Sequence, residues 1–372
     1  MHVGLNVLHL VPGETGGGET YVRRLVPALL SLDEAPRLTL FAAAEAHPSL
    51  LAEPWATEVS IVRVPVQAQS RTRRVFAEQT LLPRAARRAR VELLHNTLNT
   101  APALPGVPQV TTIHDVIYKR FPETAGRLNA GVALLVPLAA RRSQRVLTVS
   151  EASKEDIVCL LGANPSRVDV APNGPGMAEP LEPIGAPELR SDLEMSAAPI
   201  VLTVAAKRPH KNLERLLAAF ERVETDAVLV VPGFATAHAA ELEARAGDRV
   251  RFVGWVDDQT LDGLYRAASC FVLPSLAEGF GLPVLEAMTR GTIVACSDIP
   301  VLHEVAGDAA LYFDPLDPGS IAGTIQRCLT DDELRRRLVA TGSKRARAFS
   351  WSTAAVETVA CYDRATHASE GA

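Results

Sequence analysis

Aromatic residues are scarce: they make up only 5 % of the 372 residues, although hydrophobic residues make up 47 %. This aliphatic composition argues against a sandwich of short aromatic strands and favours an α/β protein. The formal net charge is only −5, so the overall charge gives no reason to expect nucleic acid as a partner. A chain of this length can form two domains of ordinary size, each with its own core.

Closely spaced cysteine pairs are also missing. The five cysteines lie far apart, and most stand among apolar residues: Cys159, Cys270, Cys296, Cys328 and Cys361. We expect buried thiols in a reducing compartment rather than disulfides or a metal site. No apolar run approaches the ~20 residues that span a bilayer, and the first residues lack the basic start of a signal peptide. The sequence therefore predicts a soluble, cytoplasmic protein.

What the chain does contain is a steady alternation of short apolar runs and longer amphipathic segments. Strands are expected at Val3–Leu8, Leu38–Phe41, Val59–Val64, Val91–His95, Val110–His114, Val146–Val149, Ile200–Ala205, Ala227–Val231, Val250–Val253, Cys270–Leu273, Ile293–Ala295 and Ala310–Phe313. Helices are expected between them, among others at Glu19–Leu32, Leu213–Val223, Thr260–Ala268 and Pro283–Arg290. This alternation predicts parallel sheets with right-handed crossovers, and the strands are too many for one ordinary sheet.

The stretch from Pro172 to Pro199 is rich in proline and glycine and separates two β-α-β series. We predict an N-terminal domain over residues 1–175, a C-terminal domain over residues 176–350, and a last helix at 351–366 that packs back on the first domain. Ligands of such sheets bind beyond the carboxyl ends of the strands. Functional residues are therefore expected in the strand-to-helix loops, around a cleft that the two domains share.

The most informative loop follows the expected strand Cys270–Leu273. It contains two glutamates eight positions apart, in Glu278-Gly-Phe-Gly-Leu-Pro-Val-Leu-Glu286. The glycines let the backbone approach a ligand, and the helix start offers N–H groups to an anion. Apolar residues surround Glu286, where an ionised carboxylate without partners is costly. This favours a ligand contact, such as a ribose diol, over an ordinary surface position.

A second loop carries cations, in Lys207-Arg208-Pro209-His210-Lys211, after the expected strand Ile200–Ala205. Cations at a helix start are unfavourable unless an anion lies there, and they suit the diphosphate of a departing nucleotide. Lys211 is the first candidate. Its upstream partner is either Lys207 or Arg208, of which we favour Arg208. The alternative is a set of solvated charges.

The first half of the chain offers two further candidates. The glycine-rich stretch Pro12–Thr20 lacks the spacing of a dinucleotide fingerprint and the Lys-Ser/Thr of a P-loop, so a plain tight turn is an alternative. His114 and Asp115 directly follow an apolar strand. A single histidine is ordinarily structural, but this position favours a functional role. Asp115 is expected to orient the loop or to cap the next segment.

Taken together and in this order, these motifs resemble the retaining GT-B glycosyltransferases of family 4, the group 1 glycosyltransferases, and the resemblance covers nearly the whole chain. It implies the GT-B architecture, in which two doubly wound Rossmann-like domains face a central cleft. It also implies an enzyme that moves a hexose from a nucleotide-diphosphate sugar to a hydroxyl acceptor, without a metal, in glycan, glycolipid or natural-product biosynthesis.

The resemblance assigns roles residue by residue. The catalytic residues implied are His114 near the donor sugar, Glu278 on the sugar hydroxyls, and Arg208 and Lys211 on the diphosphate. The donor-binding residues implied are Gly17, Gly18, Val256, Gly279, Phe280, Gly281, Leu282 and Glu286. Of these, Val256 would contact the base and Glu286 the ribose.

The donor and the reaction leave alternatives. The His-Asp pair resembles that of mannosyltransferase-like members and favours GDP-mannose, with UDP- or dTDP-sugars next. No Asp-x-Asp follows an apolar strand as in metal-dependent GT-A enzymes, so we expect no metal and no other cofactor. A nucleotide-sugar epimerase and a non-catalytic sugar-nucleotide-binding protein are the rival functions. The spacing of the paired glutamates favours transfer over the epimerase, and the full set of site residues argues against a loss of catalysis.

Arginines are concentrated in the segment Arg71–Arg90. In family members with lipid acceptors, a basic amphipathic surface there docks on the inner face of the membrane, and each arginine near anionic lipid contributes about 1 kcal/mol. Peripheral membrane contact is thus one interpretation of the segment. A solvated, arginine-rich face is the interpretation that we prefer.

Overall fold

The computed structural model describes residues 1–122, 129–177, 184–192, 197–234 and 238–370. The chain forms two compact units, Met1–Gly174 with Ser350–Ala372, and Pro175–Phe349. These boundaries lie one residue from those expected, and the last helix, α15 (Trp351–Glu370), falls in the first unit. Within the described residues, no helix combines the length and the apolar content needed to cross a bilayer.

The first unit is built on a seven-stranded parallel sheet in the order β3-β2-β1-β4-β5-β6-β7. Its strands are β1 (His2–Val7), β2 (Arg37–Ala42), β3 (Ser60–Arg63), β4 (Leu93–Asn96), β5 (Gln109–Thr112), β6 (Arg145–Thr148) and β7 (Val168–Val170). Of these, β7 was not predicted, because a three-residue strand with a charged centre gives no apolar run.

Helices connect these strands and supply the rest of the first core. They are α1 (Gly17–Leu30), α2 (Ala46–Leu51), α3 (Arg71–Ala89), α4 (Ile117–Arg120), α5 (Asn129–Arg142) and α6 (Glu151–Leu161). Ser150 caps α6 as predicted, since its hydroxyl accepts a hydrogen bond from the Ser153 N–H. Helix α15 packs along α1 and contacts β5, β6 and β7, so the end of the chain belongs to the first core.

The second unit has a six-stranded parallel sheet in the order β10-β9-β8-β11-β12-β13. Its strands are β8 (Ile200–Leu202), β9 (Val228–Pro232), β10 (Val250–Gly254), β11 (Ala268–Leu273), β12 (Val294–Ser297) and β13 (Ala310–Phe313). Its helices are α7 (Ala186–Asp192), α8 (Leu213–Phe220), α9 (Ala239–Ala244), α10 (Asp258–Ala267), α11 (Leu282–Thr289), α12 (Pro300–Ala306), α13 (Pro318–Thr330) and α14 (Asp332–Ala346).

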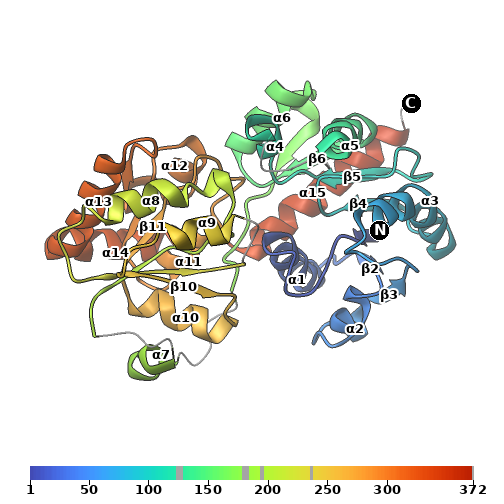
Figure 1. Ribbon diagram of the computed structural model, residues 1–372. Coiled ribbons are helices and arrows are strands. Elements are labelled where there is room, and N and C mark those ends of the chain that lie inside the picture. Colours follow the sequence, from blue (N-terminus) through green and yellow to red (C-terminus); the bar gives the residue numbers. More distant parts are fainter. Residues whose placement is uncertain (123–128, 178–183, 193–196, 235–237, 371–372) are drawn as a thin grey trace. The chain divides into compact units, whose positions relative to one another are not determined.

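Helices cover both faces of the second sheet. Figure 1 shows α8 and α13 over one face and α10 under the other. On the first face, Leu216 and Phe220 of α8 share a buried cluster with Ile321 and Ile325 of α13 and with strand residues of the sheet. Because both faces are covered, these strands read as continuous apolar runs, which is why they could be located from the sequence.

Both sheets are doubly wound, and each changes direction once. In the first sheet the change lies between β1 and β4, and in the second between β8 and β11. At such a switch point the connections after the two neighbouring strands run to opposite faces, and ligands bind at the carboxyl ends of these strands. The loops after β8 and β11 carry the two charged motifs, so the topology brings these motifs together.

Candidate active site

The central feature of the second unit is an ion pair across its switch point. Lys211 closes the turn Pro209–Lys211 that follows β8, and Glu278 lies in the loop after β11. The Lys211 Nζ lies 2.6 Å from the Glu278 Oε1, and the two side chains are only 18 % and 9 % exposed. The structure thus joins two predicted site residues that lie far apart in the sequence.

Further hydrogen bonds hold these two loops together. Asn212 adopts a left-handed conformation with φ 59°, and its side-chain amide donates to the carbonyl of Pro274 at 2.9 Å and to that of Pro315 at 2.7 Å. The Leu276 N–H also donates to the His210 carbonyl at 2.8 Å. Asparagine tolerates this backbone conformation better than most residues. The Lys-Asn pair therefore places the cation and fixes the loop.

The Glu278 carboxylate receives a second hydrogen bond on the same oxygen. The hydroxyl of Ser275, which is fully buried, donates to Oε1 at 2.6 Å. Charge-assisted hydrogen bonds of this kind are short and strong. With Lys211 and Ser275 both on Oε1, the orientation of the carboxylate is fixed by residues from both loops.

Glu286 lies one turn into α11, which begins at Leu282 after Gly281 with φ 96°. The side chain is buried, so its carboxylate needs partners, as the surrounding apolar residues indicated. One partner is the hydroxyl of Tyr265 in α10, which donates to Glu286 Oε2 at 2.9 Å. The sequence did not reveal Tyr265, because its place in an amphipathic helix is typical of ordinary core. Its hydroxyl was the available signal, since a buried tyrosine needs a hydrogen-bond partner.

The glycine-rich loop between the glutamates is closely packed. A Cβ on Gly281 would lie 2.7 Å from Leu302 Cδ2, and its positive φ also favours glycine. The Phe280 side chain is buried and packs edge-on against Phe349, with ring centroids 5.7 Å apart. Only the backbone of Phe280 is therefore placed to face a ligand, while Gly279 and Leu282 remain partly exposed.

The two adjacent cations after β8 lie in different surroundings. Lys207 is 2 % exposed, and its ammonium donates to the Gly233 carbonyl and lies 5.8 Å from the centre of the Phe252 ring. Burial lowers the pKa of Lys207. Arg208 is exposed. The structure therefore uses Lys207 inside the unit and leaves Arg208 accessible to an anion.

Val256 follows β10, which is the edge strand of the sheet and lies two strands away from β8. Val256 is partly exposed, and its neighbour Trp255 is 60 % exposed. The Gly254 carbonyl accepts a hydrogen bond from the Gly233 N–H at 2.6 Å. This bond ties the end of β10 to the end of β9.

In the first unit, the glycine-rich stretch folds differently from the expectation. Helix α1 begins at Gly17 rather than at Glu19, so Gly17 and Gly18 form its first turn and are not loop residues. The residues with left-handed backbones are Gly13 and Gly16, with φ 75° and 63°. The Gly16 carbonyl accepts the first helical hydrogen bond, from the Glu19 N–H at 2.9 Å. The N–H groups of Gly17 and Gly18 come before this bond in the chain, so they have no acceptor within the helix.

His114 is fixed at the carboxyl edge of the first sheet. Its ring nitrogen Nε2 lies 3.0 Å from the Thr97 carbonyl, and its backbone N–H donates to the Asn99 side chain at 2.8 Å. A carbonyl only accepts, so Nε2 carries the proton and Nδ1 keeps its lone pair. Burial lowers the pKa of His114, so the imidazole is neutral. The Asp115 carboxylate accepts from the Ile117 N–H at 3.0 Å, which is the local capping expected of it.

Neutral polar groups surround this histidine. The Tyr21 ring stands edge-on to His114 with centroids 4.7 Å apart, and the Tyr21 hydroxyl is 3.1 Å from that of Thr112. The His95 ring nitrogens Nε2 and Nδ1 lie 2.7 Å from the hydroxyls of Thr112 and Tyr362, respectively. Burial lowers the pKa of His95 to about 3. The side chains in contact with His114 are therefore polar and uncharged, while the Asp115 carboxylate lies next to it in the chain.

Helix α3 carries the basic segment of the first unit. Its exposed side chains include Arg73, Phe76, Arg84, Arg87 and Arg88. Arg74 is partly buried instead, and its guanidinium donates to the Ala68 carbonyl at 3.3 Å. The inner side of the helix contributes to the core through Ala77, Leu82 and Ala86. The helix is thus amphipathic, with a basic outer face.

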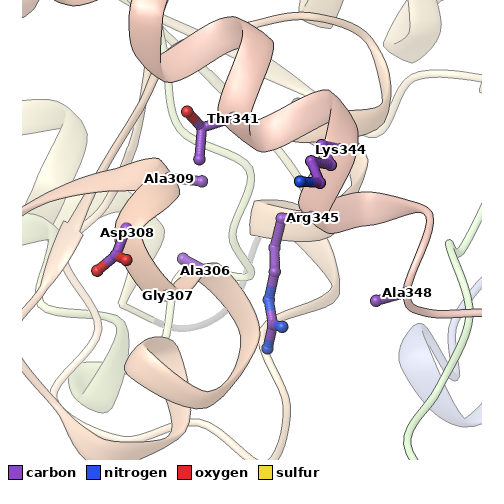
Figure 2. A pocket seen from close by; sticks show the side chains of 8 residues that line it. All are labelled: Ala306, Gly307, Asp308, Ala309, Thr341, Lys344, Arg345 and Ala348. Atoms are coloured by element: carbon purple, nitrogen blue, oxygen red, sulfur yellow. The ribbon is translucent and has the colours of Figure 1, made fainter.

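A cavity of about 370 Å³ lies between the end of α12 and α14, lined among others by Thr341, Lys344 and Arg345 (Figure 2). Arg345 donates to the Glu304 and Val305 carbonyls, at 2.6 and 3.0 Å, and so caps α12. The predicted site residues do not line this cavity. Among the described residues, no group of three or more histidine, cysteine, aspartate or glutamate side chains is arranged to hold a metal ion.

Comparison with family models gives one match in each unit. Residues 15–175 match the model "Glycosyltransferase Family 4". Residues 187–345 match the model "Glycosyl transferases group 1". Between them the two matches include every predicted site residue.

Two curated relatives show the similarity in sequence. The O-antigen chain mannosyltransferase B of Escherichia coli is 30 % identical over 273 residues, which cover 68 % of this chain and 69 % of the relative. The O-antigen chain mannosyltransferase RfbU of Salmonella typhimurium is 29 % identical over 241 residues, 63 % of this chain and 64 % of the relative.

Two solved structures show the similarity in fold. Sucrose-phosphate synthase from Thermosynechococcus elongatus has a TM-score of 0.79 at 22 % identity, covering 99 % of this chain and 100 % of the other. The Anabaena protein HepE in complex with UDP and glucose has a TM-score of 0.76 at 20 % identity, covering 98 % of this chain and 99 % of the other.

Proposed function

We propose a donor, a mechanism and a set of residue roles for this chain, which belongs to the group 1 glycosyltransferases of family 4 and is a glycosyltransferase enzyme with the GT-B fold. The reaction proposed is the transfer of a hexose from a nucleotide-diphosphate sugar to a hydroxyl acceptor in glycan biosynthesis, with retention of configuration and without a metal ion. The observation that supports it best is the Lys211–Glu278 ion pair at the switch point of the second sheet.

The ion pair suits a donor that carries both a diphosphate and sugar hydroxyls. Lys211 offers an ammonium to the diphosphate, and Glu278 offers carboxylate oxygens to the sugar hydroxyls. Each holds the other in place before the donor binds. When the donor enters, the diphosphate replaces Glu278 as the partner of Lys211, and the exposed Arg208 adds a second cation. Charged hydrogen bonds of this kind act most strongly where water is excluded.

The proposed chemical step needs no protein nucleophile. The bond between the sugar C1 and the diphosphate oxygen breaks, and the electron pair leaves with the nucleoside diphosphate. The acceptor hydroxyl forms its bond to C1 of the oxocarbenium-like sugar from the same face, and its proton passes to the departing diphosphate oxygen. Lys211 and Arg208 stabilise the negative charge that develops on this leaving group. Metal independence is proposed because these two cations supply the positive charge that the leaving group needs.

For the first unit we propose the acceptor side of the reaction. Its sheet edge presents neutral groups, namely His114 Nδ1, hydroxyls and the N–H groups of Gly17 and Gly18. Such groups exchange hydrogen bonds with sugar hydroxyls without the cost of removing a charge from water. His114, held neutral by burial, which lowers its pKa, is the residue of this set that we expect to act nearest to the transferred sugar.

Mannose is the sugar that we propose, with guanosine as the nucleoside. Both curated relatives described above are mannosyltransferases by name, and the His-Asp pair at 114–115 is of the mannosyltransferase-like kind. The competing proposal is a UDP-sugar, since HepE is seen with UDP and glucose. The relatives are closer to this chain in sequence than HepE is, so GDP-mannose is preferred.

A thermal-shift panel of the purified chain tests the proposal. GDP, UDP, dTDP and ADP are each added with Mg²⁺ or with EDTA. A ligand at a hundred times its dissociation constant stabilises the fold by about 2.7 kcal/mol, which raises the melting temperature measurably. We expect GDP to stabilise the protein equally in both conditions. Stabilisation only with Mg²⁺ would overturn the metal-free mechanism, and no stabilisation by any nucleotide would overturn the donor site.

A further inference from the structure

Glu278 and Glu286 each accept a hydrogen bond from a buried hydroxyl of the second unit. Ser275 donates to Glu278 Oε1 at 2.6 Å, and Tyr265 donates to Glu286 Oε2 at 2.9 Å. Both hydroxyl-bearing side chains are fully buried. Ser275 belongs to the same loop as its glutamate. Tyr265 comes from a different helix, so its hydrogen bond fixes Glu286 relative to the rest of the unit.

The Tyr265 ring is held on several sides. It packs against Phe271 of β11 with centroids 5.5 Å apart, and the Arg290 guanidinium lies 5.8 Å from its centre. The hydroxyl of Thr292 donates to the Tyr265 carbonyl at 2.6 Å. A side chain fixed in this way has little freedom to follow a moving partner. The Tyr265 hydroxyl is therefore held at a fixed place beside the Glu286 carboxylate.

A buried ion pair fixes the backbone beneath Glu286 as well. The side chains of Arg290, which directly follows α11, and of Asp262 in α10 are both buried, with Arg290 Nε 2.6 Å from Asp262 Oδ1. Arg290 Nη1 also donates to the Glu286 carbonyl at 3.3 Å. Side chain and main chain of Glu286 are thus both anchored to α10. Burial and the Glu286 carboxylate raise the pKa of Tyr265 well above its usual range, so the phenol keeps its proton and donates.

We propose that Tyr265 is a positioning residue that sets the Glu286 carboxylate for the two ribose hydroxyls of the donor nucleotide. The proposal rests on the proposed function, in which Glu286 receives the ribose. A carboxylate accepts best from a vicinal diol when its plane is aligned with both hydroxyls. The Tyr265 hydroxyl occupies one direction on Oε2 and so fixes that plane before the donor arrives.

A purely structural tyrosine would behave differently. If the hydroxyl only satisfied a buried carboxylate, its loss would lower stability and weaken all nucleotides alike. A positioning role weakens the contribution of the ribose hydroxyls in particular. The two roles are separated by comparing a ribonucleotide with its 2′,3′-dideoxy form, because only the ribonucleotide carries the diol.

The experiment measures dissociation constants by calorimetry for GDP and 2′,3′-dideoxy-GDP, or for the matching pair of whichever nucleotide stabilises the wild type. The proteins are the full-length wild type and Tyr265→Phe, which keeps the ring contacts. Tyr312→Phe is the matched control, because it removes a hydroxyl that donates at 2.6 Å to the Gly307 carbonyl elsewhere in the same unit.

We expect wild type and Tyr312→Phe to prefer the ribonucleotide by about tenfold or more, the size of a hydrogen bond to a charged group. In Tyr265→Phe most of this preference disappears. Equal preference in Tyr265→Phe and wild type overturns the positioning role and leaves the proposed function intact. A wild type without any preference, or without nucleotide binding, overturns the ribose role of Glu286 and the positioning role together.

A second pair of variants covers the case in which Tyr265→Phe does not fold. Glu286→Gln removes the negative charge beside Tyr265. In the double variant, Tyr265→Phe therefore leaves no buried carboxylate without its hydrogen-bond donor. If Tyr265 acts only through Glu286, this addition changes the ribose preference of Glu286→Gln by less than about twofold, a small part of one hydrogen bond to a charged group. A larger further change contradicts the proposal.

Discussion

At the carboxyl edge of the second unit's sheet an ion pair joins two loops, whereas at the same edge of the first unit's sheet neutral polar side chains surround His114. In the second unit, Lys211 and Glu278 form an ion pair, and Arg208 is exposed in the same loop as Lys211. In the first unit, burial lowers the pKa of His95 and His114, so these imidazoles are uncharged. Both edges nevertheless come from the same doubly wound topology.

In the function that we propose, this difference separates two tasks that a glycosyltransferase must perform. A nucleotide-diphosphate sugar brings negative charge, which requires fixed cations. An acceptor hydroxyl is neutral and is better served by hydrogen-bonding groups that cost little to desolvate. In the function that we propose, the fold supplies the place for each site, and the charge state of a few side chains decides what each site accepts.

The largest effect is expected from removing the central cation. Lys211→Met leaves the diphosphate without its main partner, so the rate of nucleoside diphosphate release from the donor falls by roughly 10²–10³-fold. Lys154→Met is the control, since Lys154 lies in α6 of the first unit and is 3.8 Å from Glu151. If Lys211→Met released the nucleoside diphosphate at the wild-type rate, the charged edge of the second unit would not be the part that acts on the diphosphate.

The adjacent cations give a sharper version of the same test. Lys207→Ala removes a buried donor to the Gly233 carbonyl, so we expect a loss of about 1–3 kcal/mol of unfolding free energy and unchanged nucleotide affinity. Arg208→Ala removes an exposed cation, so affinity falls about tenfold while stability changes by less than about 0.5 kcal/mol. Thermal unfolding measures the stability of both variants, and calorimetry measures their affinity for the nucleotide. A loss of affinity in Lys207→Ala with a loss of stability in Arg208→Ala would mean that Lys207 binds the diphosphate and Arg208 stabilises the fold.

The neutral histidines of the first unit predict a dependence of stability on pH. Burial lowers the pKa of His9 and of His95 to about 3, so both stay neutral while the unfolded chain, with a histidine pKa near 6.5, takes up protons. Stability is therefore full above pH 6.5 and is lost as pH falls toward 3. Between pH 7.5 and pH 5.5, each such histidine lowers the free energy of unfolding by about 1.4 kcal/mol.

Unfolding in denaturant at these two pH values measures the loss. His95→Gln should be less stable than wild type at both, because it perturbs two buried hydrogen bonds. Its loss of stability between the two pH values should nevertheless be smaller than that of wild type, by about 1.4 kcal/mol. An unchanged loss would mean that His95 is not held neutral in the fold.

The smallest effect is expected on α3. Its outer arginines are solvated, so the combined change of Arg73, Arg84 and Arg88 to Gln should alter stability by less than about 0.5 kcal/mol per site. Sedimentation with vesicles of anionic lipid should be the same for wild type and variant. A loss of sedimentation in the variant would favour the membrane-docking interpretation, and the first unit would then use charge after all.

The long apolar strands, the two sheets and the charged loops could be predicted from the sequence. The strands are buried on both faces and therefore appear as apolar runs. Glu278 and Lys211 stand in the loops that follow two of them, and Glu286 lies in the helix that follows the second loop. The start of α1 could not be placed in this way. Gly17 and Gly18 are typical loop residues, and only the fold shows that they form the first turn of the helix.

The contacts that support the site could not be predicted from the sequence either. Tyr265 meets Glu286, and Asn212 meets Pro274, because α10 packs beside α11 and the loop after β8 lies against the loop after β11. Such pairs depend on which elements are neighbours in space. The pattern of apolar residues predicts which face of a helix is buried, but not which side chain lies opposite.

The most direct test of the account is the affinity for GDP, measured by calorimetry in EDTA for wild type, Lys211→Met and His114→Ala. The account predicts that Lys211→Met weakens binding at least tenfold, about 1.4 kcal/mol, because the charged edge of the second unit holds the nucleotide. His114→Ala should bind GDP as wild type does and show its defect only in transfer. Equal binding by Lys211→Met and wild type, or a loss as large in His114→Ala, would contradict the division of tasks between the two units.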